Sequence, residues 1–349
     1  MQHTAIEQVI PEAIVNSYQL QQCQVQFITH GHLNKTYKIT KPDATHYILQ
    51  TLNPIFKAEI HENIKAVTSH LKRRGLTTPE LLPNREHALW TLDENGQVWR
   101  FMTHMDGKTI LKADSNRICY SAGQMLGRFH TALLDLECDF QGTRLGVHDT
   151  PWHIEQLGKV LQAYNNHPLY QQLEPIAVDI FKRFELMDLA EELPERKVHG
   201  DPKVSNFLFS QNDQALCLVD LDTLNTMALP LELGDALRSF CNRLAEDSGT
   251  ANFSREFFTA FMSGYASETK VWLTKDEWQA IPRFTERIAL ELAARFARDT
   301  LSENYFGWDK VRFQRSGEHQ LLRAQGQLQL AREINKDLRK LDEELNSCR

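Results

Sequence analysis

The stretch from Val198 to Asp222 constrains the fold of this chain most strongly, because two short apolar runs in it flank a cluster of residues that favour turns. The apolar runs cover residues 207–209 and 215–221, and the cluster between them is Ser-Gln-Asn-Asp, residues 210–213. This pattern is typical of a β-hairpin with two buried strands. Because a hairpin brings its two ends together, we expect the polar residues on either side of it to lie close to each other.

Oxygen-bearing side chains gather at the two ends of the predicted hairpin. Asp201 and Asn206 precede its first strand, while Asp220 and Asp222 lie at the end of its second strand. Carboxylate and amide oxygens suit Mg²⁺, which proteins usually hold with one or two carboxylates together with substrate phosphates. We therefore predict a Mg²⁺-dependent phosphoryl-transfer site. The alternative is that these are turn residues of an ordinary hairpin.

The composition excludes several classes of protein. With 349 residues, of which 42% are hydrophobic, the chain is long enough for two packed lobes. A net charge of −7 argues against a nucleic-acid partner. The six cysteines form no CxxC pair, which predicts reduced thiols in a cytoplasmic protein. The amino terminus lacks the pattern of a signal peptide and no segment approaches 18 apolar residues, so we expect no membrane partner.

The first third of the chain predicts a small sheet with one helix. Residues 1–23 favour short helical turns that act as a cap, and residues 58–74 favour a helix. Strand-like composition occurs in five segments, residues 25–29, 35–40, 46–52, 88–92 and 97–102. This is the layout of a nucleotide-holding kinase lobe, although other α+β domains share it. We assign residues 1–104 to an N-terminal nucleotide-binding lobe with a helical cap.

The rest of the chain is mainly helical. Predicted helices begin near Asp114 or Ser115 and recur over residues 152–191, 255–265, 275–297 and 320–345. We assign residues 105–349 to a C-terminal catalytic and acceptor-binding lobe. The fold class is therefore α+β, a bilobal protein-kinase-like fold with a small β-sheet N-lobe and a larger mainly helical C-lobe. The last helix carries one apolar stripe, which either packs on its own lobe or forms a homodimer seam, so both monomer and homodimer stay open.

The hairpin motifs resemble those of a known family. His199-Gly200-Asp201 with Asn206, followed by Leu218-Val219-Asp220, is similar to the HGDxxxxN catalytic loop and apolar-apolar-Asp metal motif of the aminoglycoside phosphotransferase and choline kinase group. This resemblance implies that Asp201 is the catalytic base and orients the acceptor hydroxyl, while Asn206 and Asp220 hold Mg²⁺ against the phosphates of ATP. Lys203 would reach the transferring phosphate, and Asp222 would assist the metal or fix the loop.

A loop between two predicted strands, residues 30–36, is expected to cover the nucleotide. It holds one glycine, Gly31, where the broader family has three. Backbone amides, together with Asn34 and Thr36, are expected to meet the phosphates. A plain hairpin loop is the alternative.

Gln50 stands where a typical kinase sheet offers a lysine to the phosphates. How the phosphates are held is therefore open, and Lys57 is one possible substitute. Residues 99–103 would form the hinge that reads the adenine edge through backbone groups, with Phe101 and Thr103 as its contacts. Gln50 itself is included among the expected nucleotide contacts.

The departure at Gln50 points to one branch of the family. The stretches GHLNKTY, YILQTLNPIF, HENIKAV and VDLDT resemble N-acetylhexosamine 1-kinases over roughly residues 25–335. The resemblance implies transfer of phosphate from ATP to the anomeric hydroxyl of N-acetylglucosamine or N-acetylgalactosamine. Residues 295–310 correspond to a part of that branch that lines the sugar site. Arg295 would bond the sugar, and Tyr305 or Trp308 would stack on it.

Other functions stay open at this point. A different acceptor, such as choline, homoserine or an aminoglycoside, is the nearest rival, because Glu232, Asp299 and Tyr305 would suit a cation. A catalytically inactive kinase fold that serves as a binding module is suggested by Gln50. A metal-dependent phosphohydrolase is a third class.

Overall fold

The computed structural model describes residues 4–28, 34–144, 146–187 and 192–348. The chain divides into two compact units. The N-terminal unit consists of residues 1–107, 135–144 and 219–225, and the C-terminal unit consists of residues 108–134, 145–218 and 226–349. The metal-motif segment predicted at the end of the hairpin therefore belongs to the N-terminal unit, whereas the hairpin itself belongs to the C-terminal unit.

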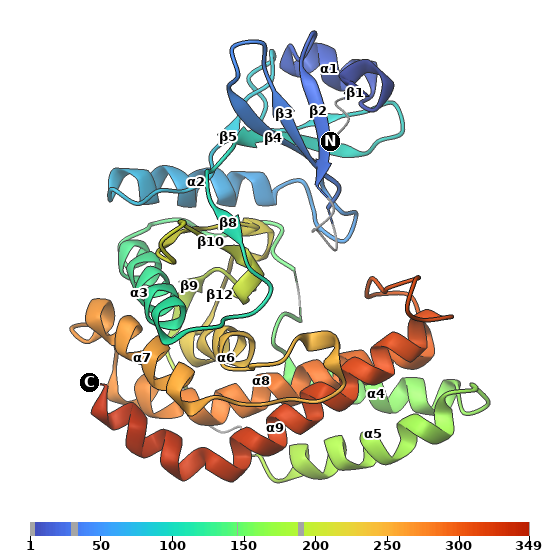
Figure 1. Cartoon of the computed structure of the whole chain (residues 1–349), viewed down its shortest axis with the longest axis vertical. Helices are drawn as coiled ribbons and strands as arrows, with labels where there is room; N and C mark the ends of the chain where they lie inside the picture. The colour runs from blue at the N-terminus through green and yellow to red at the C-terminus, as the bar shows by residue number, and fades with distance from the viewer. Residues whose placement is uncertain (1–3, 29–33, 145, 188–191, 349) are drawn as a thin grey trace. The chain divides into compact units, whose positions relative to one another are not determined.

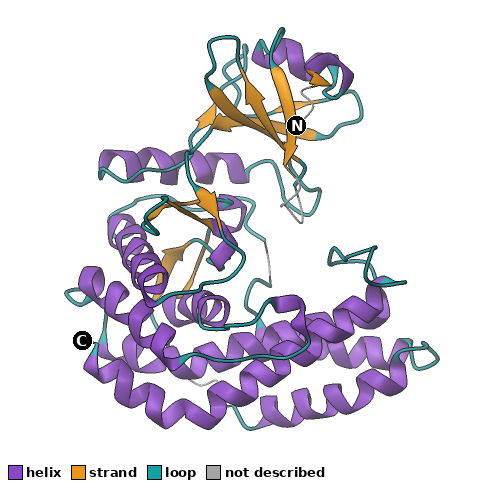
Figure 2. Ribbon diagram, in the orientation of Figure 1, coloured by secondary structure: helices purple, strands orange, loops and turns teal. Residues whose placement is uncertain are grey.

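The N-terminal unit is built on an antiparallel sheet, visible in orange in Figure 2. Within the described residues the sheet has seven strands in the order β1-β2-β3-β4-β7-β5, with β6 also paired to β7. Its strands are β1 (Thr4–Ala5), β2 (Gln24–Ile28), β3 (Thr36–Thr40), β4 (His46–Thr51), β5 (Leu81–Leu82), β6 (Thr91–Leu92) and β7 (Val98–Thr103). Its helices are η1 (Ile6–Gln8), α1 (Glu12–Tyr18), α2 (Ile60–Arg73) and η3 (Leu221–Thr223).

The two faces of this sheet differ in chemistry. Ile39, Leu49 and Phe101 are buried in one apolar core together with side chains of α1. Because side chains alternate between the faces of a strand, the neighbouring residues Gln50 and Arg100 lie on the opposite face. These two residues are also direct cross-strand partners in the pairing of β4 with β7.

The C-terminal unit is mainly helical (Figure 1). Its helices are α3 (Asn116–Leu133), α4 (Thr150–Ala163), α5 (Tyr170–Glu185), α6 (Leu229–Phe240), η4 (Glu246–Ser248), α7 (Arg255–Thr269), α8 (Lys275–Ser302) and α9 (Ser316–Ser347). Helices α3 and α7 pack closely through glycines, since a Cβ atom at Gly123 would lie 2.0 Å from the carbonyl oxygen of Phe261. The apolar stripe of α9 is buried mainly against α8 of the same chain.

Short strands of the C-terminal unit carry the predicted hairpin. They are β8 (Lys108–Thr109), β9 (Glu195–Val198), β10 (Phe207–Phe209), β11 (Ala215–Leu218) and β12 (Asn225–Ala228), with a 3₁₀ turn η2 (Val204–Asn206). Strands β10 and β11 pair antiparallel, with Phe207 opposite Leu218, so the predicted hairpin is confirmed. Its turn includes Asp213 at φ 58°, a conformation that Asp tolerates better than most residues.

The structure confirms the predicted α+β class, with a small antiparallel sheet and a larger helical region. It differs in detail at 215–221, where β11 ends at Leu218 because Asp220 adopts a left-handed conformation and η3 follows. Strand β5 and helix α6 were not predicted. In the part of the chain that the structure describes, no helix is both long and apolar enough to cross a membrane.

Candidate active site

The catalytic-loop motif follows β9 in the C-terminal unit. Gly200 has φ 84°, a backbone conformation that glycine adopts without steric cost, and the turn there leads directly to Asp201. Oδ2 of Asp201 accepts hydrogen bonds from Nζ of Lys203 at 2.5 Å and from Nδ2 of Asn206 at 3.2 Å. Nδ2 of Asn206 also donates to the backbone oxygen of Asp201 at 2.8 Å. The structure thus brings these three predicted residues together, and both bonds of Asn206 use its nitrogen.

Asp201 sits in an environment that favours its ionised form. Burial alone would raise the pKa of this carboxyl, but the Lys203 ammonium, followed by His199 and Arg238, lowers it overall. The side chain remains 27% exposed. An ionised, partly accessible carboxylate can accept a hydrogen bond from a substrate hydroxyl and so orient it for attack.

Glu232 on α6 holds the backbone of this loop. Its fully buried carboxylate accepts hydrogen bonds from the N–H groups of His199 at 2.9 Å and of Gly200 at 2.8 Å. Burial would raise the pKa of Glu232, but hydrogen bonding to His130 and the nearby charges lower it overall. Glu232 therefore remains a carboxylate, and it fixes the turn from which Asp201 projects.

Two further buried residues extend this support. Nε2 of His130 lies 3.2 Å from Oε1 of Glu232, and Nδ1 of His130 lies 2.9 Å from the hydroxyl of Tyr265. Asp235, on the same helix, does not contribute to this support but pairs with Arg238, one helical turn along α6. The signal that points to Glu232 is an acidic residue inside the apolar run 229–233 at the start of α6.

Asp220 and Asp222 lie on the segment that belongs to the N-terminal unit. Asp220 has φ 63° and ψ 56°, and Asp222 follows within η3. Both carboxylate oxygens of Asp222 bind the guanidinium group of Arg100, and Oδ2 also accepts a hydrogen bond from Nδ2 of Asn34 at 2.7 Å. The structure therefore places Asp222 in a buried ion pair with Arg100.

The predicted nucleotide contacts on β3 and β4 join the same network. Nε2 of Gln50 donates to the hydroxyl of Thr36 at 2.9 Å, and Oε1 of Gln50 accepts from Arg100 at 2.8 Å. Oδ1 of Asn34 accepts from the backbone of Asn53 at 2.8 Å. Gly31 lies outside the described residues.

The predicted hinge residues lie within the sheet. Phe101 on β7 pairs with Leu49 on one side and with Leu82 on the other. The backbone N–H of Thr103 donates to Glu80 at 3.0 Å. The chain leaves the sheet after Thr103, at residues 104–107.

The predicted acceptor residues meet around Phe306. The guanidinium group of Arg295 lies over the Phe306 ring at 5.6 Å, and the Tyr305 ring packs edge-on against Phe306 at 4.6 Å. The carboxylate of Asp299 fixes this loop, since it accepts backbone hydrogen bonds from Asn304, Tyr305 and Phe306.

A buried polar cluster connects this region towards the catalytic loop. Glu291, one helical turn before Arg295, accepts hydrogen bonds from Thr150 at 2.7 Å and pairs with His148 at 3.3 Å. Burial would lower the pKa of His148, but Glu291 and then Asp235 raise it overall. Asp235 in turn pairs with Arg238, and the charge of Arg238 lowers the pKa of Asp201. Charged groups therefore lie between the Glu291 cluster and the catalytic loop within this unit.

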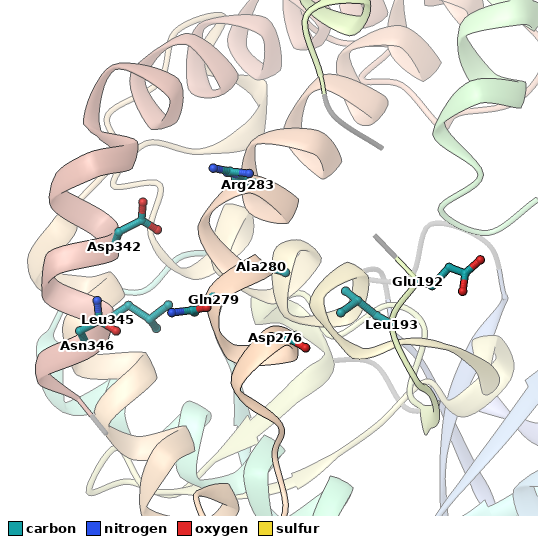
Figure 3. A pocket seen from close by; sticks show the side chains of 9 residues that line it. All are labelled: Glu192, Leu193, Asp276, Gln279, Ala280, Arg283, Asp342, Leu345 and Asn346. Carbon is teal, nitrogen blue, oxygen red and sulfur yellow. The ribbon is translucent and has the colours of Figure 1, made fainter. Parts of the chain in front are cut away.

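A cavity of about 510 Å³ opens elsewhere in the C-terminal unit (Figure 3). It involves none of the predicted site residues. Its lining consists mainly of side chains of α8 and α9, namely Glu192, Leu193, Asp276, Gln279, Ala280, Arg283, Asp342, Leu345 and Asn346.

The sheet unit, the helical unit and the catalytic loop define a protein-kinase-like enzyme fold. A model of the phosphotransferase enzyme family matches residues 24–313, and the chain belongs to this family. It is accordingly a small-molecule phosphotransferase.

Solved structures of low sequence identity share this fold. An aminoglycoside phosphotransferase from Alicyclobacillus acidocaldarius is 18% identical with a TM-score of 0.63, and the match covers 96% of this chain and 97% of that chain. An amicoumacin kinase in complex with AMP-PNP and Ca²⁺ is 16% identical with a TM-score of 0.62, over 93% of this chain and 91% of that one. A choline kinase from Cryptosporidium parvum is 14% identical with a TM-score of 0.58, over 93% of each chain.

Proposed function

We propose that this phosphotransferase is an ATP- and Mg²⁺-dependent kinase that phosphorylates the anomeric hydroxyl of an N-acetylhexosamine. The motifs shared with N-acetylhexosamine 1-kinases support the sugar as acceptor. The observation that carries the proposal is that, among the described residues, the candidate groups for a cationic acceptor, Glu232, Asp299 and Tyr305, already contact other groups of the protein. An N-acetylhexosamine is uncharged and needs none of them.

The acidic groups that would suit a cation are occupied. Glu232 is fully buried and binds the backbone of the catalytic loop. Asp299 is also fully buried and binds backbone N–H groups of the loop that carries Tyr305. Glu291, on the same helix as Asp299, is 1% exposed and is bound by Thr150 and His148. A cationic acceptor bound by any of these three carboxylates would have to break one of these arrangements.

The aromatic groups that would suit a cation face guanidinium groups of the protein. Arg295 lies over Phe306 at 5.6 Å, and Arg298 lies 5.8 Å from the Trp152 ring and 6.0 Å from the Tyr305 ring. An aromatic cage attracts an ammonium group through the ring faces. Each of these rings already lies beside a guanidinium group of the chain, which repels a second cation and so favours a neutral ligand with hydroxyl and carbonyl oxygens over choline.

The roles of the predicted residues follow from this proposal. Arg295, whose side chain is 20% exposed, would donate hydrogen bonds to sugar oxygens, and Tyr305 would contact the sugar ring. Asp201 would accept a hydrogen bond from the anomeric hydroxyl and orient its oxygen towards the terminal phosphate of ATP. Lys203, bound to Asp201, would bring positive charge to the transferring phosphate.

The donor atoms fit Mg²⁺, which prefers carboxylate and amide oxygens. Asn206 would offer Oδ1, since its described hydrogen bonds use Nδ2, and Asp220 would offer its carboxylate. Bound Mg²⁺ would neutralise charge on the phosphates of ATP. We propose that Asp222 does not ligate the metal directly, because Arg100 and Asn34 bind its oxygens.

For the nucleotide, we propose that Gly31 and neighbouring backbone amides meet the phosphates. Asn34, Thr36 and Gln50 would shape this loop, because their side chains bond within the N-terminal unit. The adenine edge would be read by backbone groups after Phe101 and Thr103, at residues 104–107, where the chain leaves the sheet. The cytoplasmic location and the choice between monomer and homodimer stay predictions.

The decisive experiment is an acceptor panel with Mg²⁺ and ATP. The panel contains N-acetylglucosamine, N-acetylgalactosamine, choline, homoserine and kanamycin, and phosphorus NMR reads the position of the new phosphate. We expect an anomeric phosphate on at least one N-acetylhexosamine, formed far more slowly by the Asp201→Asn variant. Glucose and 1-deoxy-N-acetylglucosamine serve as controls for the acetamide and the anomeric hydroxyl. Turnover of choline, homoserine or kanamycin without turnover of either amino sugar would reject the sugar assignment.

A further inference from the structure

Arg100 and Asp222 form an ion pair inside the N-terminal unit. Each side chain is 2% exposed. The two terminal nitrogens of Arg100 bind the two carboxylate oxygens of Asp222, with Nη2 lying 3.1 Å from Oδ2. Burying two charges costs solvation energy, and such a pair persists only where geometry and further hydrogen bonds compensate. The bidentate arrangement meets that requirement.

Neighbouring side chains complete the hydrogen bonding of the pair. Oε1 of Gln50 accepts from Nε of Arg100 at 3.0 Å and from Nη2 at 2.8 Å. On the other side, Asn34 donates to Asp222 at 2.7 Å. The network therefore connects β4 and β7 of the sheet to η3, the segment that directly follows Asp220.

The usual ion pair of a kinase sheet has no counterpart at its usual positions. A typical kinase pairs a strand lysine with a glutamate of the following helix. Here the strand position is Gln50, and Glu62 on α2 is exposed to solvent. The buried residue next to Glu62 is His61, and burial followed by the nearby Arg100 charge lowers its pKa to about 4. His61 is thus neutral, and Asp222 is the carboxylate that compensates Arg100.

We propose that Arg100 is a positioning residue that fixes the segment Val219–Asn225 through Asp222 and so holds Asp220 in its metal-binding conformation. Asp220 has φ 63°, a left-handed conformation that is uncommon outside glycine, although Asp adopts it more readily than most residues. Two residues later, Asp222 is clamped by Arg100. The pair replaces the strand lysine and helix glutamate as the fixed ion pair of this unit. Because Asp222 is engaged with Arg100, Asp220 is the carboxylate of this segment that binds the metal. The metal-binding role of Asp220 rests on the proposed function.

A double-mutant cycle separates positioning from direct metal binding. Arg100→Gln and Asp222→Asn each leave one buried charge uncompensated, whereas the double variant removes both charges. We expect each single variant to raise the Mg²⁺ concentration for half-maximal activity at least tenfold, with KM for the acceptor unchanged. We expect the double variant to be no worse than either single variant. If Asp222 were a metal ligand, its loss would multiply the defect of Arg100→Gln, and that result would overturn the proposal.

Hydrogen exchange gives a readout that does not depend on catalysis. Arg100→Gln should increase amide exchange in residues 219–225 at least tenfold, while Arg100→Lys, which keeps the charge, should restore part of the protection. Arg74→Gln is the matched control, because Arg74 pairs with Asp135 in the same unit but is 50% exposed. Unchanged exchange in 219–225 with a folded Arg100→Gln protein would refute the positioning role. If the wild type phosphorylates no acceptor, the proposed function fails, and the exchange measurement still decides the role of Arg100.

Discussion

Lys203 donates a hydrogen bond to the carboxylate of Asp201, with 2.5 Å between Nζ and Oδ2. The two residues are separated only by Pro202 on one loop, whose backbone is held by Glu232. A base that is already paired with a cation stays ionised and retains a fixed direction. This suits phosphoryl transfer, where orienting the hydroxyl contributes more than removing its proton early.

Replacing Asp201 with Asn should remove most of the transfer activity. We expect kcat to fall by about 10²–10⁴-fold, because the amide cannot take up the proton of the acceptor hydroxyl. Binding of Mg²⁺ and ATP, measured by calorimetry, should change little. Single-turnover transfer measured with the acceptor found in the panel checks the prediction, and undiminished turnover would contradict the base assignment.

Replacing Lys203 with Met should move the acidic limb of the pH profile. Lys203 lowers the pKa of Asp201, so its loss leaves the effect of burial, which raises that pKa. Because the ionised form is the active one, the pH below which kcat falls should rise. Lys112→Met, a change at an exposed lysine of the same unit, is the control and should leave the profile in place. A profile of Lys203→Met that superimposes on the wild type would refute this coupling.

Replacing Glu232 with Gln should impair both stability and catalysis. The amide group of Gln would face backbone N–H donors in a fully buried site, which we expect to cost about 3–5 kcal/mol in the free energy of unfolding. A lower kcat with unchanged KM for ATP should accompany it. Tyr265→Phe removes only the outer hydrogen bond to His130 and should cost about 0.5–1.5 kcal/mol. Urea unfolding and steady-state kinetics measure both effects, and equal stability of Glu232→Gln and wild type would contradict the anchoring role.

The pair of Glu291 and His148 should stabilise the fold within a limited pH window. Burial would raise the pKa of Glu291, but His148, His153 and Arg295 lower it to about 2, so its contribution is lost as pH falls from 4.5 towards that value. The pKa of His148 is raised above 6.5, so its contribution is complete below 6.5 and is lost as pH rises through the folded-state pKa. The stability difference between wild type and Glu291→Gln should therefore be largest between pH 4.5 and 6.5. Urea unfolding across this range measures it, and a difference that grows steadily above pH 6.5 would contradict the assignment.

The contact of α3 with α7 should not accept a larger residue. Gly123→Ala would place Cβ 2.0 Å from the carbonyl oxygen of Phe261, so the helices must separate. We expect a loss of about 1–3 kcal/mol in stability. Gly158→Ala is the matched control, because the nearest atom to its Cβ is 3.9 Å away, on Phe181. Thermal unfolding of the two variants should differ clearly, and equal melting temperatures would show that the helices adjust without cost.

Much of the fold was predictable because local patterns decide it. Alternation and helical spacing predicted β2, β3, β4, α2 and the hairpin to within a few residues. Strand β5 was missed because it has only two residues, Leu81 and Leu82, which present no alternation. Helix α6 is not predicted because its first turn contains Pro230 and its middle contains Gly234, two residues that interrupt a helical pattern.

In the candidate site, contacts between residues close in sequence were predictable and contacts between distant residues were not. Asp201, Lys203 and Asn206 lie within one short loop, so their spacing alone suggested that they act together. Glu232 meets His199 across 33 positions, and Arg100 meets Asp222 across 122. Pairs this far apart leave no spacing signal in a single sequence. The sequence therefore predicts a role for Asp222 at the metal or in the loop, but it does not predict that Arg100 is its partner.

The division of the N-terminal unit into three stretches of chain affects the order in which the protein can fold during synthesis. Residues 1–107 contain Arg100, but its partner Asp222 arrives only with residues 219–225. Ribosomes add about 5–20 residues per second. The guanidinium group of Arg100 therefore stays without its carboxylate partner for on the order of ten seconds after the sheet has been synthesised. During that interval the unit is incomplete, and a chaperone that binds exposed strands would have time to act on it. The segment that carries Asp220 is thus also the last part of the N-terminal unit to be synthesised.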